Sequence, residues 1–259
     1  MKIAISQPTY LPWLGYFDLI DQVDLFVLFD SVQFERQSWQ QRNRIKTPVG
    51  LQWLTVPVMF RGRFGQTIKD VEIRDLAFWR KHLRAIELNY RRSAFFDSYF
   101  PDFSLLLQSC VTDPLLVNCN VRLIEWFNNI LGIQTPLIRS SGGKYQGKRA
   151  ALLTNICQSL RAARYVSPLG SAVYLLDEID SFADKNIEVE FQHYQHPEYT
   201  QQFPPFLAYA SALDLIFNEG PAALEIIRRG RGRSWRPEEL SPHQVDVRTP
   251  ASATATFQP

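Results

Sequence analysis

The chain has 259 residues, of which 46% are apolar and 21% are charged, and its formal net charge is +2. This composition is typical of a folded globular protein and excludes a disordered or collagen-like chain. No apolar run approaches the roughly 20 residues of a membrane-spanning helix, and the small net charge argues against nucleic acid as a partner.

The first 30 residues predict two core strands with a short helix between them. Residues 2–6 and 23–30 are apolar runs, and the helix begins near Gly15. A strand, a helix and a second strand in this order are typical of a doubly wound sheet. We therefore expect an α/β fold of the Rossmann-like class, with a mostly parallel sheet, flanking helices and a helical insertion.

The later elements follow the same logic. Residues 51–58 alternate like a strand, whereas residues 77–92 and 113–131 carry apolar residues at helical spacing, which predicts the insertion. After them a β-α-β-α-β rhythm is predicted, followed by an irregular stretch and a final helix. In chain order these segments are residues 135–139, 148–161, 165–167, 171–183, 187–191 and 210–217.

Residues 1–230 are predicted to form a single α/β domain. Five arginines between Arg228 and Arg236 lead into a stretch rich in Arg, Pro, Ser, Thr and Ala. Such a composition offers little to bury, so residues 231–259 are predicted to be a disordered tail. The three cysteines lack CxxC spacing and are expected to be reduced core thiols. With no apolar leader segment at the N-terminus, we expect a cytoplasmic protein.

A dense set of aromatic and polar residues follows the first predicted strand. Polar groups and aromatic rings alternate here in Gln7, Tyr10, Trp13 and Tyr16, and prolines at positions 8 and 12 stiffen the loop between them. A rigid loop between a strand and a helix N-terminus can hold an anion. The alternative is a loop that packs its aromatics over the edge of the sheet.

Charged residues after the predicted strands suggest further ligand contacts. Asp30 ends a buried run, where open parallel sheets place carboxylates that contact ligands. Arg42, Asn43 and Arg44 offer two guanidinium groups and an amide, which suits phosphate or carboxylate, although a solvated turn would show the same residues. Lys144, in a serine- and glycine-rich loop, is a weaker phosphate candidate because the loop lacks P-loop spacing.

Two histidines are candidates for proton transfer, because histidine titrates near neutral pH. His196 lies in an irregular segment near Tyr199 and Gln201, where loop residues often bind ligands. His82 lies beside the apolar stripe of a predicted helix, so a structural role is equally open to it. No cysteine or carboxylate completes a zinc pattern with these histidines, and no metal site is predicted.

The chain resembles the WbqC-like protein family, a bacterial family found among genes for O-antigen and other surface polysaccharides. The resemblance covers nearly all of residues 1–220, and its motifs include Gln7 to Trp13 with Gly15 and Tyr16, Arg42 to Arg44, Lys81 to Leu83, Tyr165 to Ser167 and His196 to Gln201. It implies a role in surface-glycan biosynthesis more than a particular reaction. It also brings Ser167 into the set of expected ligand contacts.

A weaker similarity connects residues 15–20 with the HIGH-motif nucleotidyltransferase superfamily, whose first strand, loop and helix hold nucleotide phosphates. Tyr16 stands where that superfamily has its second histidine, which puts direct adenylyl transfer in doubt.

These observations lead to a hypothesis with two rivals. The leading hypothesis is a transferase that binds a nucleotide or other phosphate-bearing donor and acts on a sugar-linked acceptor. Gln7, Tyr10 and Tyr16 would orient the donor, with Trp13 as a further contact, and Arg42, Asn43 and Arg44 would hold its charge. Asp30 would contact a hydroxyl or amine, and His82 or His196 would move a proton. One rival is an acyl or aminoacyl transferase on an amino sugar, with a donor such as coenzyme A. The other is a noncatalytic protein that binds a glycan or a partner enzyme.

Overall fold

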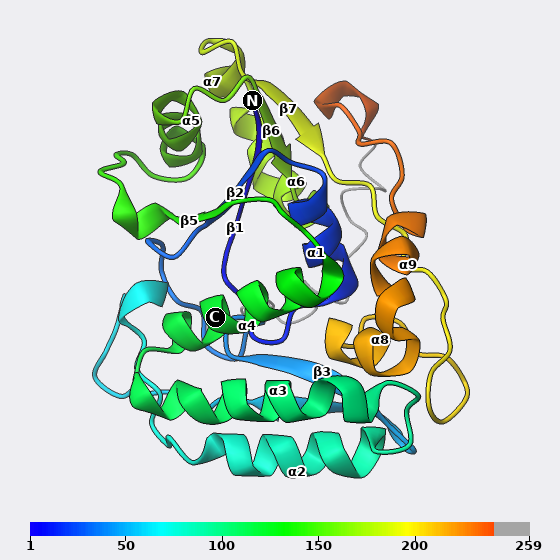
Figure 1. Ribbon diagram of the computed structural model, residues 1–259. Helices are drawn as coiled ribbons and strands as arrows, with labels where there is room; N and C mark the ends of the chain where they lie inside the picture. The colour runs from blue at the N-terminus through cyan, green and yellow to red at the C-terminus, as the bar shows by residue number, and fades with distance from the viewer. Residues whose placement is uncertain (241–259) are drawn as a thin grey trace.

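The computed structural model describes residues 1–240 of the chain, and it centres on a parallel five-stranded sheet (Figure 1). All four strand pairs of this sheet are parallel. Its strands, in spatial order, are β5 (Leu137–Arg139), β2 (Leu25–Leu28), β1 (Lys2–Ser6), β6 (Arg164–Ser167) and β7 (Glu188–Phe191). The expected α/β class with a mostly parallel sheet is confirmed.

The strand order contains one reversal, and it lies beside β1. From β1 the chain moves outward to β2 and β5, then returns to the other side of β1 with β6 and β7. In open α/β sheets such a reversal leaves a crevice at the carboxyl ends of the two strands that flank it. The topology therefore marks the ends of β1 and β6 as the place for a ligand.

Helices cover both faces of the sheet, because side chains alternate along β1. Ile3 and Ile5 join the core formed with α5, α6 and α7, whereas Ala4 faces the larger core that contains α1 and α4. The helices of these two layers are α1 (Leu14–Asp21), α4 (Leu116–Leu131), α5 (Ala150–Ser159), α6 (Ala172–Leu175) and α7 (Asp180–Ala183). The predicted single helix over 171–183 is thus two short helices.

The expected helical insertion lies between β2 and β5, where Figure 1 shows α2, α3 and α4 stacked beside β3. It contains the antiparallel hairpin β3 (Arg42–Thr47) and β4 (Gly50–Thr55), then α2 (Phe78–Tyr90) and α3 (Phe96–Ser109). Neither β3 nor α3 was predicted. Pro101 lies inside α3 and argues against a helix by about 3 kcal/mol, but the buried Phe103 and Leu107 favour it.

The C-terminal part has two helices rather than the single one predicted: α8 (Ala212–Glu219) is followed by α9 (Ala223–Arg229). Residues 231–240, expected to belong to a disordered tail, lie against the domain. Arg231 forms ion pairs with Asp18 and Asp21, and Trp235 forms a β-bridge with Phe191. The rest of the predicted tail, 241–259, lies outside the described residues.

Two other expectations can be compared with the described residues. The three cysteines are free and buried, as expected. Within residues 1–240, no helix combines the length and apolar character needed to cross a membrane.

Candidate functional site

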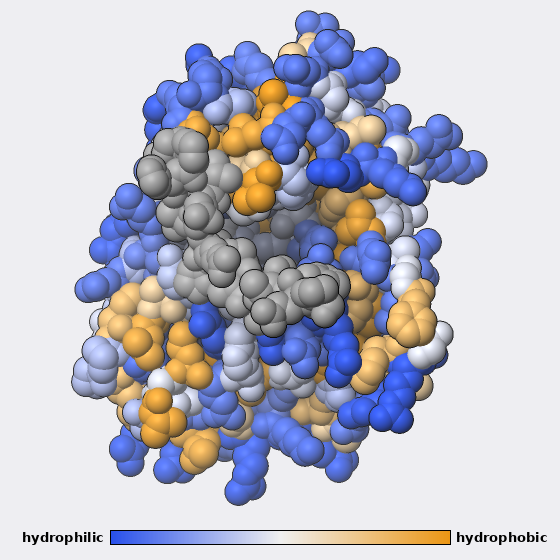
Figure 2. All heavy atoms as spheres, turned by 180° about the vertical axis from the view of Figure 1, so that it is seen from behind, coloured by the Kyte–Doolittle hydropathy of each residue, from blue (hydrophilic) through white to orange (hydrophobic). Residues whose placement is uncertain are grey.

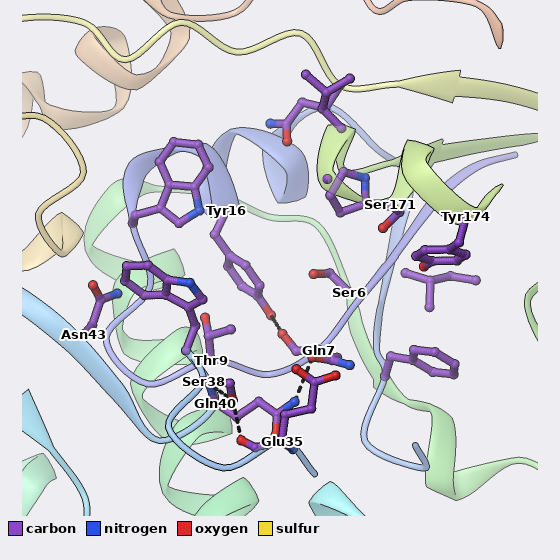
Figure 3. Close-up of a pocket in the computed structure, with 18 of the residues that line it drawn as sticks. Ser6, Gln7, Thr9, Tyr16, Glu35, Ser38, Gln40, Asn43, Ser171 and Tyr174 are labelled. Carbon is purple, nitrogen blue, oxygen red and sulfur yellow. Dashed lines mark hydrogen bonds between the residues drawn. The ribbon is translucent and has the colours of Figure 1, made fainter. Parts of the chain in front are cut away.

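A cavity of about 470 Å³ opens at the carboxyl ends of β1 and β6, at the reversal in strand order (Figure 3). Gln7 directly follows β1, and residues 168–171 directly follow β6. The volume lies within the range of small-molecule sites. The cavity and the topology therefore indicate the same place for a ligand.

Loops that follow four strands of the sheet supply the walls. The loop after β1 gives Gln7, and the loop after β2 gives residues 35–40. The segment after β6 gives Ser171 and Tyr174, which lie across the cavity from Asn43 in Figure 3, and Gln192 follows β7. Further lining residues are Ser6, Thr9, Trp13, Tyr16, Tyr165 and Tyr194.

Gln7 is fixed in the floor of the cavity by two neighbours. The Tyr16 hydroxyl donates to the Gln7 carbonyl oxygen at 3.2 Å, and Gln40 Nε2 donates to Gln7 Oε1 at 2.8 Å; Figure 3 draws both contacts. Burial raises the pKa of the Tyr16 hydroxyl, which keeps it protonated as a donor. Among the described residues nothing accepts from Gln7 Nε2, so this donor is available to a ligand.

Trp13 forms one wall because of a glycine. Its indole ring lies over Gly15, where an added Cβ would come within 2.3 Å of the ring. Tyr194 and Tyr209 hold the ring from other sides, each with a centroid separation of 5.5 Å. Only a residue without a side chain at position 15 allows Trp13 to lie this close to α1.

The lining is rich in neutral polar groups and poor in charge. Hydroxyls, carboxamides and indoles dominate, and Glu35 and Arg36 are the charged side chains among the described lining residues. Arg36 also stacks on Phe60, with 3.8 Å between guanidinium carbon and ring centroid. Such a surface can bind a polar molecule through many hydrogen bonds and through stacking on aromatic faces.

Four of the predicted ligand contacts, Gln7, Trp13, Tyr16 and Asn43, line this cavity. Asn43 is also part of the scaffold, because its Nδ2 donates to the Leu11 carbonyl oxygen and its Oδ1 accepts from the backbone of Arg44.

Tyr10 and His82 lie in the core instead of the cavity lining. The Tyr10 hydroxyl is 2.7 Å from His82 Nδ1, and the imidazole also bonds to the backbone of Thr55. Burial lowers the pKa of His82 to about 4, so its ring is neutral at pH 7. The contacts satisfy both side chains internally.

Asp30 is fully buried and is satisfied by the segment after β5. Its carboxylate accepts from Arg139 Nε at 2.6 Å, from the Ser141 backbone at 2.8 Å and from the Ser141 hydroxyl at 2.7 Å. Burial alone would raise the pKa of Asp30, but the hydrogen bonds from Ser141 and Arg139 outweigh it and hold the pKa below its usual value. Asp30 thus ties β2 to the segment after β5 and is outside the cavity lining.

His196, Tyr199 and Gln201 lie together, one layer behind Trp13. The His196 ring is nearly parallel to Trp13, with 6.4 Å between centroids. Its Nε2 is buried without a partner among the described residues, and burial lowers the pKa of His196 to about 4. Tyr199 and Gln201 both donate to the buried carboxylate of Asp214, at 2.7 and 2.9 Å.

The remaining predicted residues lie outside the cavity lining. Arg42 and Arg44 lie on β3, where they stack on Trp53. Lys144 is exposed, and Ser167 is buried at the end of β6 with its hydroxyl near Tyr165. The sequence interpretation missed Ser6, Glu35, Arg36, Ser171, Tyr174 and Gln192. Ser6 ends β1, Ser171 lies in the segment just after β6, and Gln192 directly follows β7, so the rule that ligands bind at strand carboxyl ends could have found these three.

The fold and the cavity define an α/β protein with a cavity of small-molecule size at the reversal of its sheet. The chain belongs to the WbqC-like protein family, whose model matches residues 7–226. It is also 37% identical over 229 residues to the uncharacterized protein Rv1507c of Mycobacterium tuberculosis, covering 88% of this chain and 97% of that protein. No solved structure matches the chain.

Proposed function

We propose that the protein is a cytoplasmic transferase of surface-glycan biosynthesis, which binds a nucleotide or another phosphate-bearing donor and transfers a group to a sugar-linked acceptor. The observation that carries the proposal is the cavity at the carboxyl ends of β1 and β6. The acceptor class rests on the association of the WbqC-like family with genes for O-antigen and other surface polysaccharides.

The lining supports the binding of a sugar within this cavity. Gln7 Nε2 offers a donor, and Ser171 and Tyr174 offer hydroxyls on the opposite wall. Trp13 and Trp39 contribute aromatic rings to the lining, against which the apolar side of a sugar ring can pack. Hydroxyl groups of a sugar can donate and accept, which matches a wall of amides and hydroxyls.

Proton transfer is assigned to Glu35 in this proposal, because it is the carboxylate among the described lining residues. A general base must lie within hydrogen-bond reach of the proton that it removes. His196, which lies behind Trp13, would act by positioning this indole. Glu35→Gln should therefore reduce turnover by at least about a hundredfold with little change in donor affinity, whereas His196→Ala should affect both.

The test is a thermal-shift titration against nucleotides, nucleotide sugars and coenzyme A. A ligand at about one hundred times its dissociation constant stabilises the folded state by about 2.7 kcal/mol. The expected result is a shift with one ligand class that is lost in Gln7→Ala and Trp13→Ala and kept in Lys144→Ala, whose side chain is exposed and outside the cavity. Product formation from that donor would then be followed. The absence of any shift would contradict the proposal.

A noncatalytic glycan-binding role is the second candidate, and the nearly neutral lining favours it. With Glu35 and Arg36 as its charged groups, the cavity suits a free glycan as well as it suits part of a donor. This role predicts saturable binding of an oligosaccharide that stays chemically unchanged. Mass spectrometry of the ligand after prolonged incubation separates the two functions.

A further inference from the structure

Two arginines beside the cavity carry charge that no acidic residue in the described part of the chain balances by an ion pair. Arg42 and Arg44 lie on the same face of β3, because side chains alternate along a strand. Within residues 1–240, no carboxylate lies at ion-pair distance from either of them. Ion pairs with carboxylates are formed by seven other arginines: Arg63, Arg139, Arg149, Arg164, Arg228, Arg231 and Arg233. Most of the arginines without an ion pair are exposed to solvent, whereas Arg42 and Arg44 are half-buried.

Indole rings hold both guanidinium groups in place. Arg42 lies 4.2 Å from the centroid of Trp53, and Arg44 lies 5.4 Å from Trp53 and 5.3 Å from Trp39. Nε of each arginine is buried without a hydrogen-bond partner, although each side chain is only half-buried. Arg44 makes one hydrogen bond, from Nη2 to the Tyr209 carbonyl oxygen at 3.3 Å. The two groups are thus oriented in advance, and their charge is partly removed from water.

Partial burial of an unbalanced charge is costly, and a bound anion would offset that cost. Burial lowers the pKa of both arginines, yet a guanidinium stays charged at neutral pH. Phosphate groups suit this geometry, because a guanidinium can donate two parallel hydrogen bonds to their oxygens. Two neighbouring arginines match two linked phosphates.

Trp39 connects this pair with the cavity. Its ring lines the cavity and also packs against Trp53, with centroids 5.2 Å apart, and against Arg44. A ligand that reaches past Trp39 would therefore meet neutral polar groups at one end and two positive charges at the other.

We infer that Arg42 and Arg44 bind the diphosphate of a sugar-diphosphate donor whose sugar occupies the cavity, with Trp39 between the two subsites. The inference rests on the proposed function and divides the donor between two surfaces. The cavity lining, in which neutral polar groups predominate, selects the sugar, and the arginine pair selects the diphosphate. A donor without phosphate would use only the cavity.

Titration calorimetry with inorganic pyrophosphate tests the arginine pair without requiring any reaction. Wild type should bind pyrophosphate saturably, and added salt should weaken the binding. Arg42→Gln and Arg44→Gln should each weaken it about tenfold or more, as expected for the loss of a charged hydrogen-bonded contact. Arg164→Gln is the matched control, because it removes a half-exposed strand arginine at a distance from the pair and should change nothing. Absent binding in wild type, or equal binding in all four proteins, would overturn the inference.

A comparison of nucleoside diphosphate sugars with the corresponding free sugars tests the division of the ligand. Arg44→Gln should weaken binding of the diphosphate sugar about tenfold and leave binding of the free sugar unchanged, whereas Trp13→Ala should weaken binding of both. Arg44→Lys, which keeps the charge without the planar fork, should recover part of the loss. If Arg44→Gln weakened the free sugar equally, the arginine would be acting on the fold of the cavity, and the inference would fail.

The two proposals fail in different ways. Suppose that a nucleotide sugar is bound and converted, and that Arg42→Gln and Arg44→Gln leave its affinity unchanged. The proposal of a transferase is then supported, and the proposal of a diphosphate site is contradicted. If pyrophosphate binding depends on the arginines but no donor is converted, the proposal of an anion site is supported and the proposal of a transferase is contradicted.

Discussion

The hydroxyl of Tyr10 lies 2.7 Å from Nδ1 of His82, and both side chains are enclosed by the core. Because the neutral imidazole has one N–H, which donates a hydrogen bond to the backbone of Thr55, Nδ1 is the acceptor and the tyrosine hydroxyl is the donor. The sequence predicts both residues in a ligand site, but in the structure they form a hydrogen bond with each other between the N-terminal loop and α2.

Tyr10→Phe should therefore reduce stability without affecting ligand binding. It leaves a buried nitrogen of His82 without a partner, which costs about 1–3 kcal/mol. Urea denaturation should show a lower midpoint with an unchanged slope. Trp13→Phe, which changes a cavity wall, should weaken ligand binding and leave stability unchanged. Unchanged stability of Tyr10→Phe would mean that the hydrogen bond adds nothing to folding.

Stability should fall as the pH is lowered from about 6.5 to about 4. The pKa of His82 and of His196 is about 4 in the folded protein, because burial disfavours the charged ring, whereas an unfolded histidine titrates near 6.5. The unfolded chain therefore binds more protons in this window, and folding becomes less favourable as pH falls. The buried His82 alone should account for about 3 kcal/mol. His82→Gln should flatten this part of the pH profile of unfolding; an equally steep profile would show that His82 is not the source.

Gly15→Ala should disturb the cavity through Trp13. The added Cβ would lie 2.3 Å from the indole ring, so the ring must move away from its wall. We expect ligand affinity to fall at least about tenfold. This loss should exceed what a smaller folded fraction of the protein would cause. Gly142→Ala is the control, because a Cβ there meets nothing within 4 Å. Equal ligand affinity in both variants would show that the position of Trp13 is unimportant for binding.

Asp214→Ala should be among the most destabilising single changes in the chain. The buried carboxylate accepts from Tyr90 at 2.8 Å, from Tyr199 at 2.7 Å and from Gln201 at 2.9 Å. Its removal leaves the hydroxyl donors of Tyr90 and Tyr199 without an acceptor, whereas Gln201 Nε2 keeps the Leu207 carbonyl oxygen, and the loss should cost about 3–5 kcal/mol. Asp102→Ala, at an exposed helical position, should cost less than about 0.5 kcal/mol. Thermal unfolding of the two variants gives the comparison, and similar midpoints would contradict this prediction.

Arg231→Ala should weaken the attachment of α1. The Asp18 carboxylate is fully buried and accepts from Arg231 Nε at 2.6 Å and from Gln192 at 2.7 Å. Burial raises the pKa of Asp18, and the hydrogen bonds from these two partners offset this increase only in part. Loss of the arginine leaves that charge unpaired and should cost about 2 kcal/mol or more.

The control for this variant is Arg233→Ala, whose ion pair with Glu239 is exposed and should contribute little. A double-mutant cycle with Asp18→Asn should show that the two changes are coupled in their effect on stability. In the Asp18→Asn background, Arg231→Ala leaves no buried charge without a partner. Additive effects of the two changes would mean that the ion pair does not hold α1.

The sequence by itself determined the α/β class, the β-α-β opening and the position of the insertion, because apolar periodicity reports which faces are buried. It also indicated that ligand contacts follow β1, and Gln7, Trp13 and Tyr16 do line the cavity. It did not reveal α3, since the proline in that segment hides a helix that is favoured by burial against other elements.

Only the tertiary structure decided which polar residues face the cavity and which satisfy one another. Asp30 and Arg139 are 109 positions apart, yet the buried carboxylate and the half-buried guanidinium form an ion pair because β5 lies beside β2. Likewise Ser171 reaches the cavity because β6 returns to β1. The physical reason is that the spacing of apolar residues along the chain shows which side chains are buried. The hydrogen-bond or ion-pair partner of a buried polar side chain depends instead on contacts between distant segments, which this spacing does not encode.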